Sequence, residues 1–179
     1  MKIGIISDTH GNVSIWNKVI SEFFNDVNLI LHAGDILAPG PKNPIKEGYS
    51  PPELANAINN SSTPIIISKG NCDSDVDDML INIPISNPYS FVHIDGMNIL
   101  ILHGHKYNLQ EISSRYKINL CISGHTHESK LEKIKNTIFC NPGSPSVPLD
   151  GIPSVGILEN NNIKIINIET KEIIKKLVL

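Results

Sequence analysis

The first half of the chain alternates between short apolar runs and apolar residues at helical spacing. β-Branched runs at residues 2–6, 28–31 and 64–68 predict three strands, each of which ends in a glycine-containing polar loop. Apolar residues recur at helical intervals from residue 13 to residue 24. The sequence Ser50-Pro51-Pro52-Glu53 predicts a second helix that Ser50 caps. This order of strands and helices favours an α/β fold.

The second half of the chain has the pattern of an antiparallel sheet. Asp95-Gly96 separates apolar runs at residues 91–94 and 98–102, which is a strong signal for a β-hairpin. Further elements are predicted as a helix at 108–116, a strand at 120–123 and three strands around Thr137, Val155 and Ile165, with residues 160–162 turning the last pair. A Pro/Gly-rich insertion, Pro39–Pro52, is too long for a minimal turn and is a candidate wall of a binding site.

Length and composition narrow the classes of protein. The chain has 179 residues, of which 40% are hydrophobic, and this suits one domain over residues 1–179 with a real core. A net charge of −3 argues against a stable nucleic-acid partner, because neutralising phosphates needs a basic face. No apolar run approaches the ~20 residues that cross a membrane, and no secretory signal is visible. We therefore expect a cytoplasmic protein whose three cysteines are reduced.

Oxygen and imidazole donors gather in loops that follow the predicted strands. These loops are Asp8-Thr9-His10, Gly34-Asp35, Gly70-Asn71-Cys72-Asp73, His103-Gly104-His105 and Gly124-His125-Thr126-His127. Open α/β sheets bind ligands at the carboxyl ends of their strands. Carboxylates, amide oxygens and imidazoles suit divalent ions such as Mn, Fe, Ni or Zn, and the lack of clustered thiolates argues against a structural zinc site. The loops therefore predict a catalytic metal centre.

In this order, the five motifs resemble those of the calcineurin-like metallophosphoesterases. The Gly-Asn-Cys-Asp variant, Gly40-Pro41-x-Asn43 and Asn141-Pro142-Gly143-Ser144 are more narrowly similar to the bacterial YfcE-type phosphodiesterase branch. The resemblance implies a four-layer α/β/β/α sandwich with two mixed sheets flanked by helices. It also implies a two-metal enzyme that hydrolyses a small phosphodiester by attack of a hydroxide bridging the metals. Manganese is the favoured ion, with nickel, zinc and iron as alternatives.

The resemblance also implies a ligand set. One ion would be held by Asp8, His10, Asp35 and His127, and the other by Asp35, Asn71, His103 and His125, so that Asp35 bridges the two. Asp35, Asn71, Cys72 and His105 are the candidate catalytic residues; His105 would orient a ligand or touch the substrate. In the wider family the residue at the Asp73 position orients the histidine that is absent here, which leaves the role of Asp73 open, and a cap for the segment at residues 76–80 is an equal alternative.

Cys72 departs from many phosphatases of the wider family, in which a histidine at this position protonates the leaving oxygen. A thiol is a poorer acid than an imidazolium, and loss of a general acid typically costs ~10²–10⁴-fold. The departure predicts a preference for phosphodiesters with activated or aryl leaving groups over ordinary phosphomonoesters.

Several alternatives stay open on the sequence alone. The retromer scaffold subunit shares the implied fold, so a catalytically weak protein-interaction scaffold is the main alternative. A phosphomonoesterase or a nuclease of the same superfamily is another. His32 and His93 suit structural roles, and the chain is a candidate homo-oligomer with no membrane partner.

Overall fold

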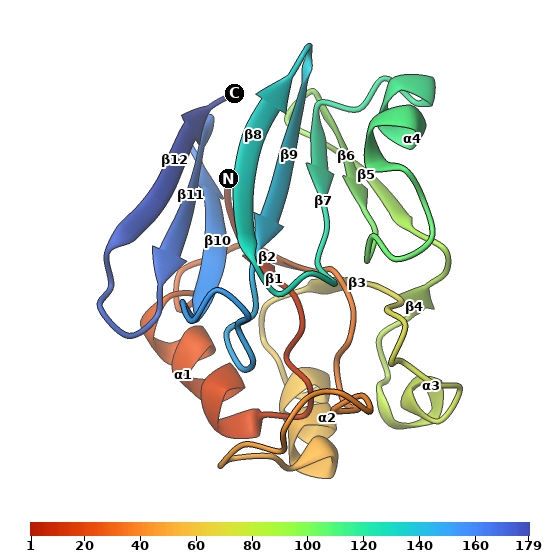
Figure 1. Cartoon of the computed structure of the whole chain (residues 1–179), viewed down its shortest axis with the longest axis vertical. Helices are drawn as coiled ribbons and strands as arrows, with labels where there is room; N and C mark the ends of the chain where they lie inside the picture. Colours follow the sequence, from red (N-terminus) through yellow and green to blue (C-terminus); the bar gives the residue numbers. More distant parts are fainter.

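The structure is a computed structural model that describes residues 1–179 and contains twelve strands and four helices (Figure 1). The strands are β1 (Lys2–Ile6), β2 (Leu29–His32), β3 (Ile65–Ser68), β4 (Ile85–Ser86), β5 (Ser90–Ile94), β6 (Met97–Ile101), β7 (Leu120–Ile122), β8 (Ser129–Ile134), β9 (Thr137–Pro142), β10 (Ser154–Glu159), β11 (Asn162–Asn167) and β12 (Ile173–Val178). The helices are α1 (Val13–Glu22), α2 (Pro51–Asn59), α3 (Asp77–Leu80) and α4 (Leu109–Arg115).

The strands form two mixed sheets. The larger sheet has the order β12-β11-β10-β1-β2-β3-β4, and the smaller has the order β5-β6-β7-β9-β8. Strands β1, β2 and β3 run parallel to one another, while β10 is antiparallel to β1. In the smaller sheet, β6, β7 and β9 are parallel. The carboxyl ends of the parallel strands in each sheet therefore lie along one edge of that sheet.

Three apolar clusters hold the layers together. The largest lies between helices α1 and α2 and the larger sheet and includes Trp16 and Leu54. A second joins the two sheets, and Ile5 of β1 and Ile101 of β6 belong to it. The third lies beneath α4 and includes Ile112. The predicted sandwich of two mixed sheets flanked by helices is confirmed, and none of these helices is long and apolar enough to cross a membrane.

The structure corrects three details of the predicted elements. Five strands follow β7, not three, because residues 129–134 and 173–178 also pair as the edge strands β8 and β12. Residues 160–162 turn β10 into β11, but β12 follows, so that turn does not join the last pair. The Ser50 side chain makes no capping bond to α2. Prolines at the first two helical positions leave only Glu53 with an N–H within reach of such a cap.

Candidate metal centre

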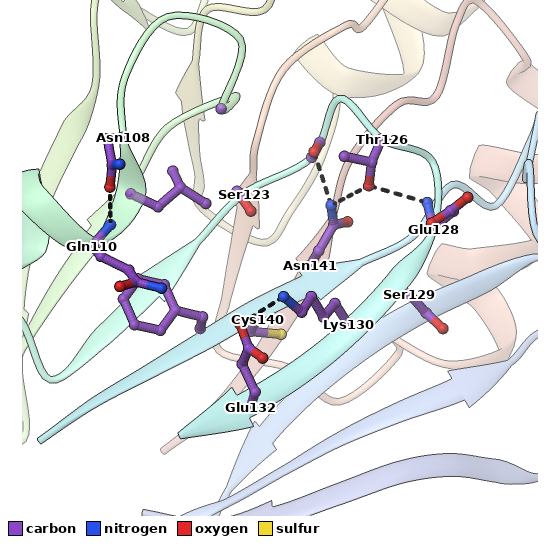
Figure 2. A pocket seen from close by; sticks show the side chains of 14 residues that line it. Asn108, Gln110, Ser123, Thr126, Glu128, Ser129, Lys130, Glu132, Cys140 and Asn141 are labelled. Carbon is purple, nitrogen blue, oxygen red and sulfur yellow. Dashed lines mark hydrogen bonds and ion pairs between the residues drawn. The ribbon is translucent and has the colours of Figure 1, made fainter. Parts of the chain in front are cut away.

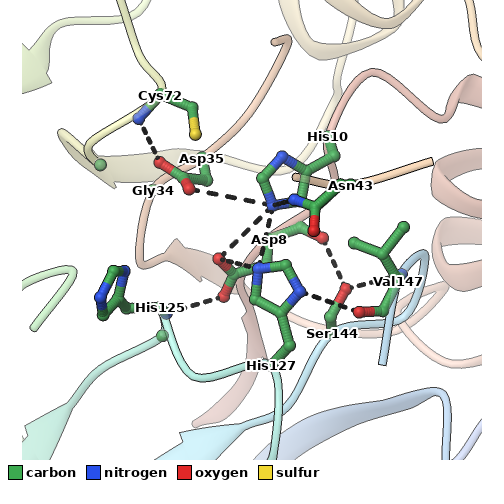
Figure 3. Close-up of polar contacts among 12 residues, drawn as sticks. Asp8, His10, Gly34, Asp35, Asn43, Cys72, His125, His127, Ser144 and Val147 are labelled. Atoms are coloured by element: carbon green, nitrogen blue, oxygen red, sulfur yellow. Dashed lines mark hydrogen bonds and ion pairs between the residues drawn. The ribbon is translucent and has the colours of Figure 1, made fainter. Parts of the chain in front are cut away.

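Carboxylates and imidazoles from both sheets meet at the carboxyl ends of parallel strands (Figure 3). Asp8 and His10 follow β1, and Asp35 follows β2. His103 follows β6 and His127 follows β7, so the smaller sheet supplies the other imidazoles. Asp8, Asp35 and His103 have ligand atoms within 4.8 Å of one another, as do Asp8, His10 and His127. These five side chains form the candidate metal centre.

The backbone of these loops adopts the left-handed conformation at residues other than glycine. Asp8, His10, Asp35, His125 and His127 have φ angles of 55°, 44°, 56°, 71° and 55°. Each such residue costs roughly 1–2 kcal/mol relative to a right-handed conformation. A regular strand would send neighbouring side chains to opposite faces, whereas these turns bring residues two apart into one site. Strain of this kind concentrates at functional sites.

Two buried polar atoms of the centre lack any hydrogen-bond partner. Asp8 Oδ1 and His103 Nε2 are both in this condition, and they lie 3.9 Å apart. Asp8 Oδ1 is also 3.3 Å from His127 Nε2, and His103 Nε2 is 3.3 Å from Asp35 Oδ2. An unsatisfied buried polar atom costs about 1–3 kcal/mol, so atoms in this state that face one another indicate a ligand site.

The three imidazoles of the centre all turn the same ring nitrogen inward. Each Nδ1 lies 2.8 Å from a backbone carbonyl and donates to it: His10 to Ala38, His103 to Ala33 and His127 to Val147. His10 Nε2 and His127 Nε2 are 3.1 Å apart, so one of them must carry an extra proton or both must share a cation. A backbone bond at the far nitrogen is typical of metal-binding histidines. The donor set therefore fits divalent transition-metal ions.

The pKa values of the centre reflect two carboxylates enclosed with imidazoles. Burial opposes ionisation of Asp35, but the charge of His103 and the N–H of Cys72 outweigh it, so the Asp35 pKa lies well below its usual range. Burial also disfavours a charged His103, yet Asp35 and Asp8 raise its pKa to about 9. The His127 pKa is raised in the same way, chiefly by Asp8. The buried carboxylates thus favour positive charge at this point.

Asp73 joins two of the ligand loops. Its carboxylate accepts backbone N–H groups from Asp35 (2.9 Å), Ile36 (2.7 Å) and Gly70 (2.7 Å). Burial raises its pKa to about 6, while these donors favour the ionised form. Asp73 does not cap residues 76–80, because Ser74 and Asp77 bond with each other at the start of α3, and Cys72 offers no ring for it to orient. Asp73 instead fixes the backbone of Asp35 against the loop that follows β3.

His32 makes a connection that the sequence did not reveal. The ring is fully buried, and its Nδ1 accepts the N–H of Gly34 at 3.1 Å. Its Nε2 therefore carries the proton and donates to Thr9 Oγ1, which in turn donates to the carbonyl of Ile36. Burial lowers the His32 pKa to about 4, which keeps the ring neutral. The side chain is structural, as predicted, but it ties the Asp8 loop to the Asp35 loop.

Cys72 and Asn71 border the centre from the loop after β3. The N–H of Cys72 donates to Asp35 Oδ1 at 2.8 Å, and its half-buried thiol lies within 4.8 Å of the ligand atoms of His10 and Asp35. Burial, and next the charge of Asp35, raises the pKa of this thiol to about 12. The Asn71 side chain is exposed and donates to Cys72 Sγ at 3.2 Å. The thiol is therefore neutral and a weak acid.

His105 and His125 lie on the His103 side of the centre. The ring centroids of His105 and His125 are 5.4 Å and 5.2 Å from that of His103. His105 Nδ1 is buried without a hydrogen bond, so His105 does not orient either neighbour through one. The His125 ring is exposed, and its backbone N–H donates to Asp8 Oδ2 at 3.1 Å. Of the predicted ligands, Asn71 and His125 are thus at the rim.

The loop that begins at Asn141-Pro142-Gly143-Ser144 packs against the centre. Ser144 Oγ donates to the backbone carbonyl of Asp8 at 2.8 Å. Three residues later, Val147 provides the carbonyl that holds the His127 ring. The loop is therefore a support for the centre and not merely a tight turn.

Two cavities flank this region. One of about 460 Å³ lies beside β8, β9 and the start of α4, where Asn141 bonds to Gly124 and Thr126 (Figure 2). None of the five residues of the centre lines it. The other, of about 750 Å³, lies between the Pro39–Pro52 insertion and the 145–153 segment, and Asn43 and Val147 line it. Because Val147 also holds the His127 ring, the second cavity adjoins the centre.

Two mixed sheets with carboxylates and imidazoles gathered at their strand ends define a metallophosphoesterase. A family model described as the calcineurin-like phosphoesterase superfamily domain matches residues 1–162. The chain belongs to this superfamily, and the predicted family and enzyme class are confirmed.

Two proteins of similar sequence are named phosphodiesterases. The chain is 32% identical to the phosphodiesterase YfcE of Escherichia coli, over 100% of this chain and 98% of that protein. It is 33% identical to the phosphodiesterase MJ0936 of Methanocaldococcus jannaschii, over 89% of this chain and 93% of the relative. The solved YfcE structure from E. coli superposes with a TM-score of 0.88 at 30% identity and 99% coverage of both chains.

A solved structure of lower sequence identity shares the fold. Vps29 from Entamoeba histolytica, in a structure described as a complex with Zn²⁺, has a TM-score of 0.69 and 18% identity, with 99% of each chain covered. At this identity the likeness concerns the fold alone.

Proposed function

We propose that this protein hydrolyses a small phosphodiester with two divalent transition-metal ions, manganese being the favoured ion. The observation that carries the proposal is the convergence of unpartnered Asp8 Oδ1 and His103 Nε2 with the Nε2 atoms of His10 and His127. The names of the similar E. coli and M. jannaschii proteins support a diester as the substrate. When bound, the cations would lower the pKa of a water molecule and offset the growing charge on the phosphoryl oxygens.

Different side chains would bind each of the two ions. Asp8, His10 and His127 would hold one, and His103 would hold the other, with Asp35 between them. Asn71 and His125 would complete the second set from the rim of the centre. The backbone carbonyl bonds at each Nδ1 keep the imidazoles aimed inward, so little reorganisation accompanies binding.

The leaving-group side of the centre lacks a strong acid. Cys72 lies beside His10 and Asp35, and the pKa of its thiol is about 12, so it seldom provides a proton at neutral pH. Esters whose leaving oxygen departs as a stable anion would therefore react fastest. His105, with its unpartnered Nδ1, is a further candidate to contact a substrate. This chemistry favours aryl or otherwise activated diesters.

A metal-replacement assay tests the proposal. The protein is stripped with a chelator, and Mn, Ni, Zn or Mg is restored in turn with bis(4-nitrophenyl) phosphate and 4-nitrophenyl phosphate as substrates. We expect metal-dependent cleavage of the diester, weak cleavage of the monoester, and loss of both in Asp35→Asn. Metal binding without turnover of any ester would overturn the proposal and favour a protein-interaction scaffold.

A further inference from the structure

The Pro39–Pro52 insertion is fixed to the ligand loop that follows β1. At its start, the carbonyl of Ala38 accepts the Nδ1–H of His10 at 2.8 Å. Near its end, the carbonyl of Gly48 accepts the N–H of Val13 at 3.0 Å. Because Ala38, just before the insertion, is bonded to His10 and Gly48, within it, is bonded to Val13 at the start of α1, the insertion forms a wall with a defined position beside the centre.

The insertion passes directly over Cys72. Gly40 has a φ of +73°, and a Cβ added to it would lie 2.8 Å from Cys72 Sγ and 3.7 Å from Asn43 Nδ2. A Cβ at 2.8 Å would overlap the sulfur, so any other residue would force the Cys72 side chain to move, and the positive φ also favours glycine. Gly40 therefore lies close to both Cys72 Sγ and Asn43 Nδ2.

The Asn43 amide points to the atom at which His10 would bind a cation (Figure 3). Its Nδ2 donates to the carbonyl of Pro39 at 2.9 Å and lies 3.3 Å from His10 Nε2. One N–H of the amide is thus engaged within the insertion, and the other faces the centre. When His10 Nε2 serves as a ligand it no longer accepts this N–H, so the amide is free to donate to an anion bound beside it.

The donor that Asn43 offers is neutral. Every ion pair to Asp8 or Asp35 comes from a histidine, and no lysine or arginine pairs with the carboxylates of the centre. An amide donor suits a singly charged phosphodiester, whereas a doubly charged monoester gains more from a cation. The cavity of about 750 Å³ that Asn43 lines gives room for an ester group, and the charges of Lys42 and Lys46 in its wall are matched in number by Glu47 and Glu169.

We propose that Asn43 is a catalytic residue that donates a hydrogen bond from Nδ2 to a non-bridging phosphoryl oxygen and thereby favours diesters over monoesters. The inference rests on the proposed function and extends it to a residue outside the metal ligands. A hydrogen bond to a charged group is typically strong enough that its loss lowers affinity about 10- to 100-fold.

Binding measurements on the Mn²⁺-loaded protein test the role of Asn43 apart from turnover. Asn43→Leu keeps approximately the same shape without the donor, and Ile45→Ala is a matched control in the same insertion, because Ile45 is 68% exposed. We expect Asn43→Leu to bind dimethyl phosphate about 10- to 100-fold more weakly by calorimetry, with Mn²⁺ affinity unchanged. Ile45→Ala should match the wild type in both. Unchanged dimethyl phosphate binding in Asn43→Leu, or an equal loss of Mn²⁺ affinity, would overturn the inference.

A change of specificity provides the second test. Asn43→Lys places a cation where the amide stood, so the ratio of kcat/KM for bis(4-nitrophenyl) phosphate to that for 4-nitrophenyl phosphate should fall at least fivefold. Both esters have the same leaving group, 4-nitrophenolate, so any effect of Cys72 on protonation of the leaving oxygen is the same for the two substrates. An unchanged ratio would contradict the role of the neutral donor. Absence of metal-dependent cleavage in the wild type would instead refute the proposed function, so the two failures are distinguishable.

Discussion

Replacement of Cys72 by histidine tests whether the leaving-group side lacks an efficient proton donor. The pKa of the thiol is about 12, whereas an unperturbed imidazolium has a pKa of ~6.5. Bound cations would offset the part of the rise in the thiol pKa that comes from the charge of Asp35, so the pKa difference lies between ~2 units for unperturbed groups and about 5.5 units. If about half of the difference is expressed in the rate of proton transfer, the gain is roughly 10- to 500-fold. The gain should apply only to esters whose leaving oxygen needs a proton.

The assay compares wild type, Cys72→His and Cys72→Ser, each loaded with Mn²⁺ and checked for metal content. The substrates are bis(4-nitrophenyl) phosphate and a diester with an alkoxide leaving group. We expect Cys72→His to be much faster on the alkoxide ester and little changed on the aryl ester, with a new fall in rate at high pH as the imidazolium loses its proton. Cys72→Ser should show no gain. A Cys72→His variant that binds metal normally but is slower on both esters would refute the reasoning.

Three further measurements follow from the structure. Asp73→Asn weakens the three backbone N–H bonds to that carboxylate and should lower the free energy of unfolding by roughly 1–3 kcal/mol in urea titrations; an unchanged midpoint would contradict it. Because the His103 pKa is about 9 and metal binding displaces the proton, calorimetric metal affinity should rise up to about tenfold per pH unit from pH 6 to 8 and level off above about 9; a flat profile would contradict this. Gly34→Ala puts a Cβ 2.6 Å from the Gly70 nitrogen, so its Tm should fall more than that of Gly96→Ala, which shares a positive φ but has open space around it. Equal losses would exclude the close approach as the cause.

The sequence predicted strands well where burial imposes a clear pattern. β1, β2 and β3 are apolar runs that end at polar loops, and all three were found. β8 and β12 were missed because the apolar residues of an edge strand need not alternate. In β12, Ile173, Ile174, Leu177 and Val178 have the spacing of a helical face, and only the pairing with β11 makes the segment a strand.

In the site too, the local sequence pattern predicted some features, whereas others depend on contacts between segments far apart in the sequence. The spacing of Asp8-x-His10 and His125-x-His127 pointed to one centre, because short loops at strand ends carry their residues to a common edge. The contacts of His32, Asp73 and Asn43 could not be predicted from the sequence. Each depends on a backbone group or ring from another loop at hydrogen-bond distance, and residue spacing does not determine how separate loops pack.

The left-handed backbone at five residues of the ligand loops has a consequence for the lifetime of the protein. At about 1 kcal/mol or more each, these conformations together cost on the order of 5 kcal/mol, against a typical total stability of 5–15 kcal/mol. Cations that bind only the folded chain offset this cost in proportion to the logarithm of their concentration. Chains made while such cations are scarce should therefore unfold more often and be degraded sooner, so that metal supply would govern the abundance of the protein as well as its activity.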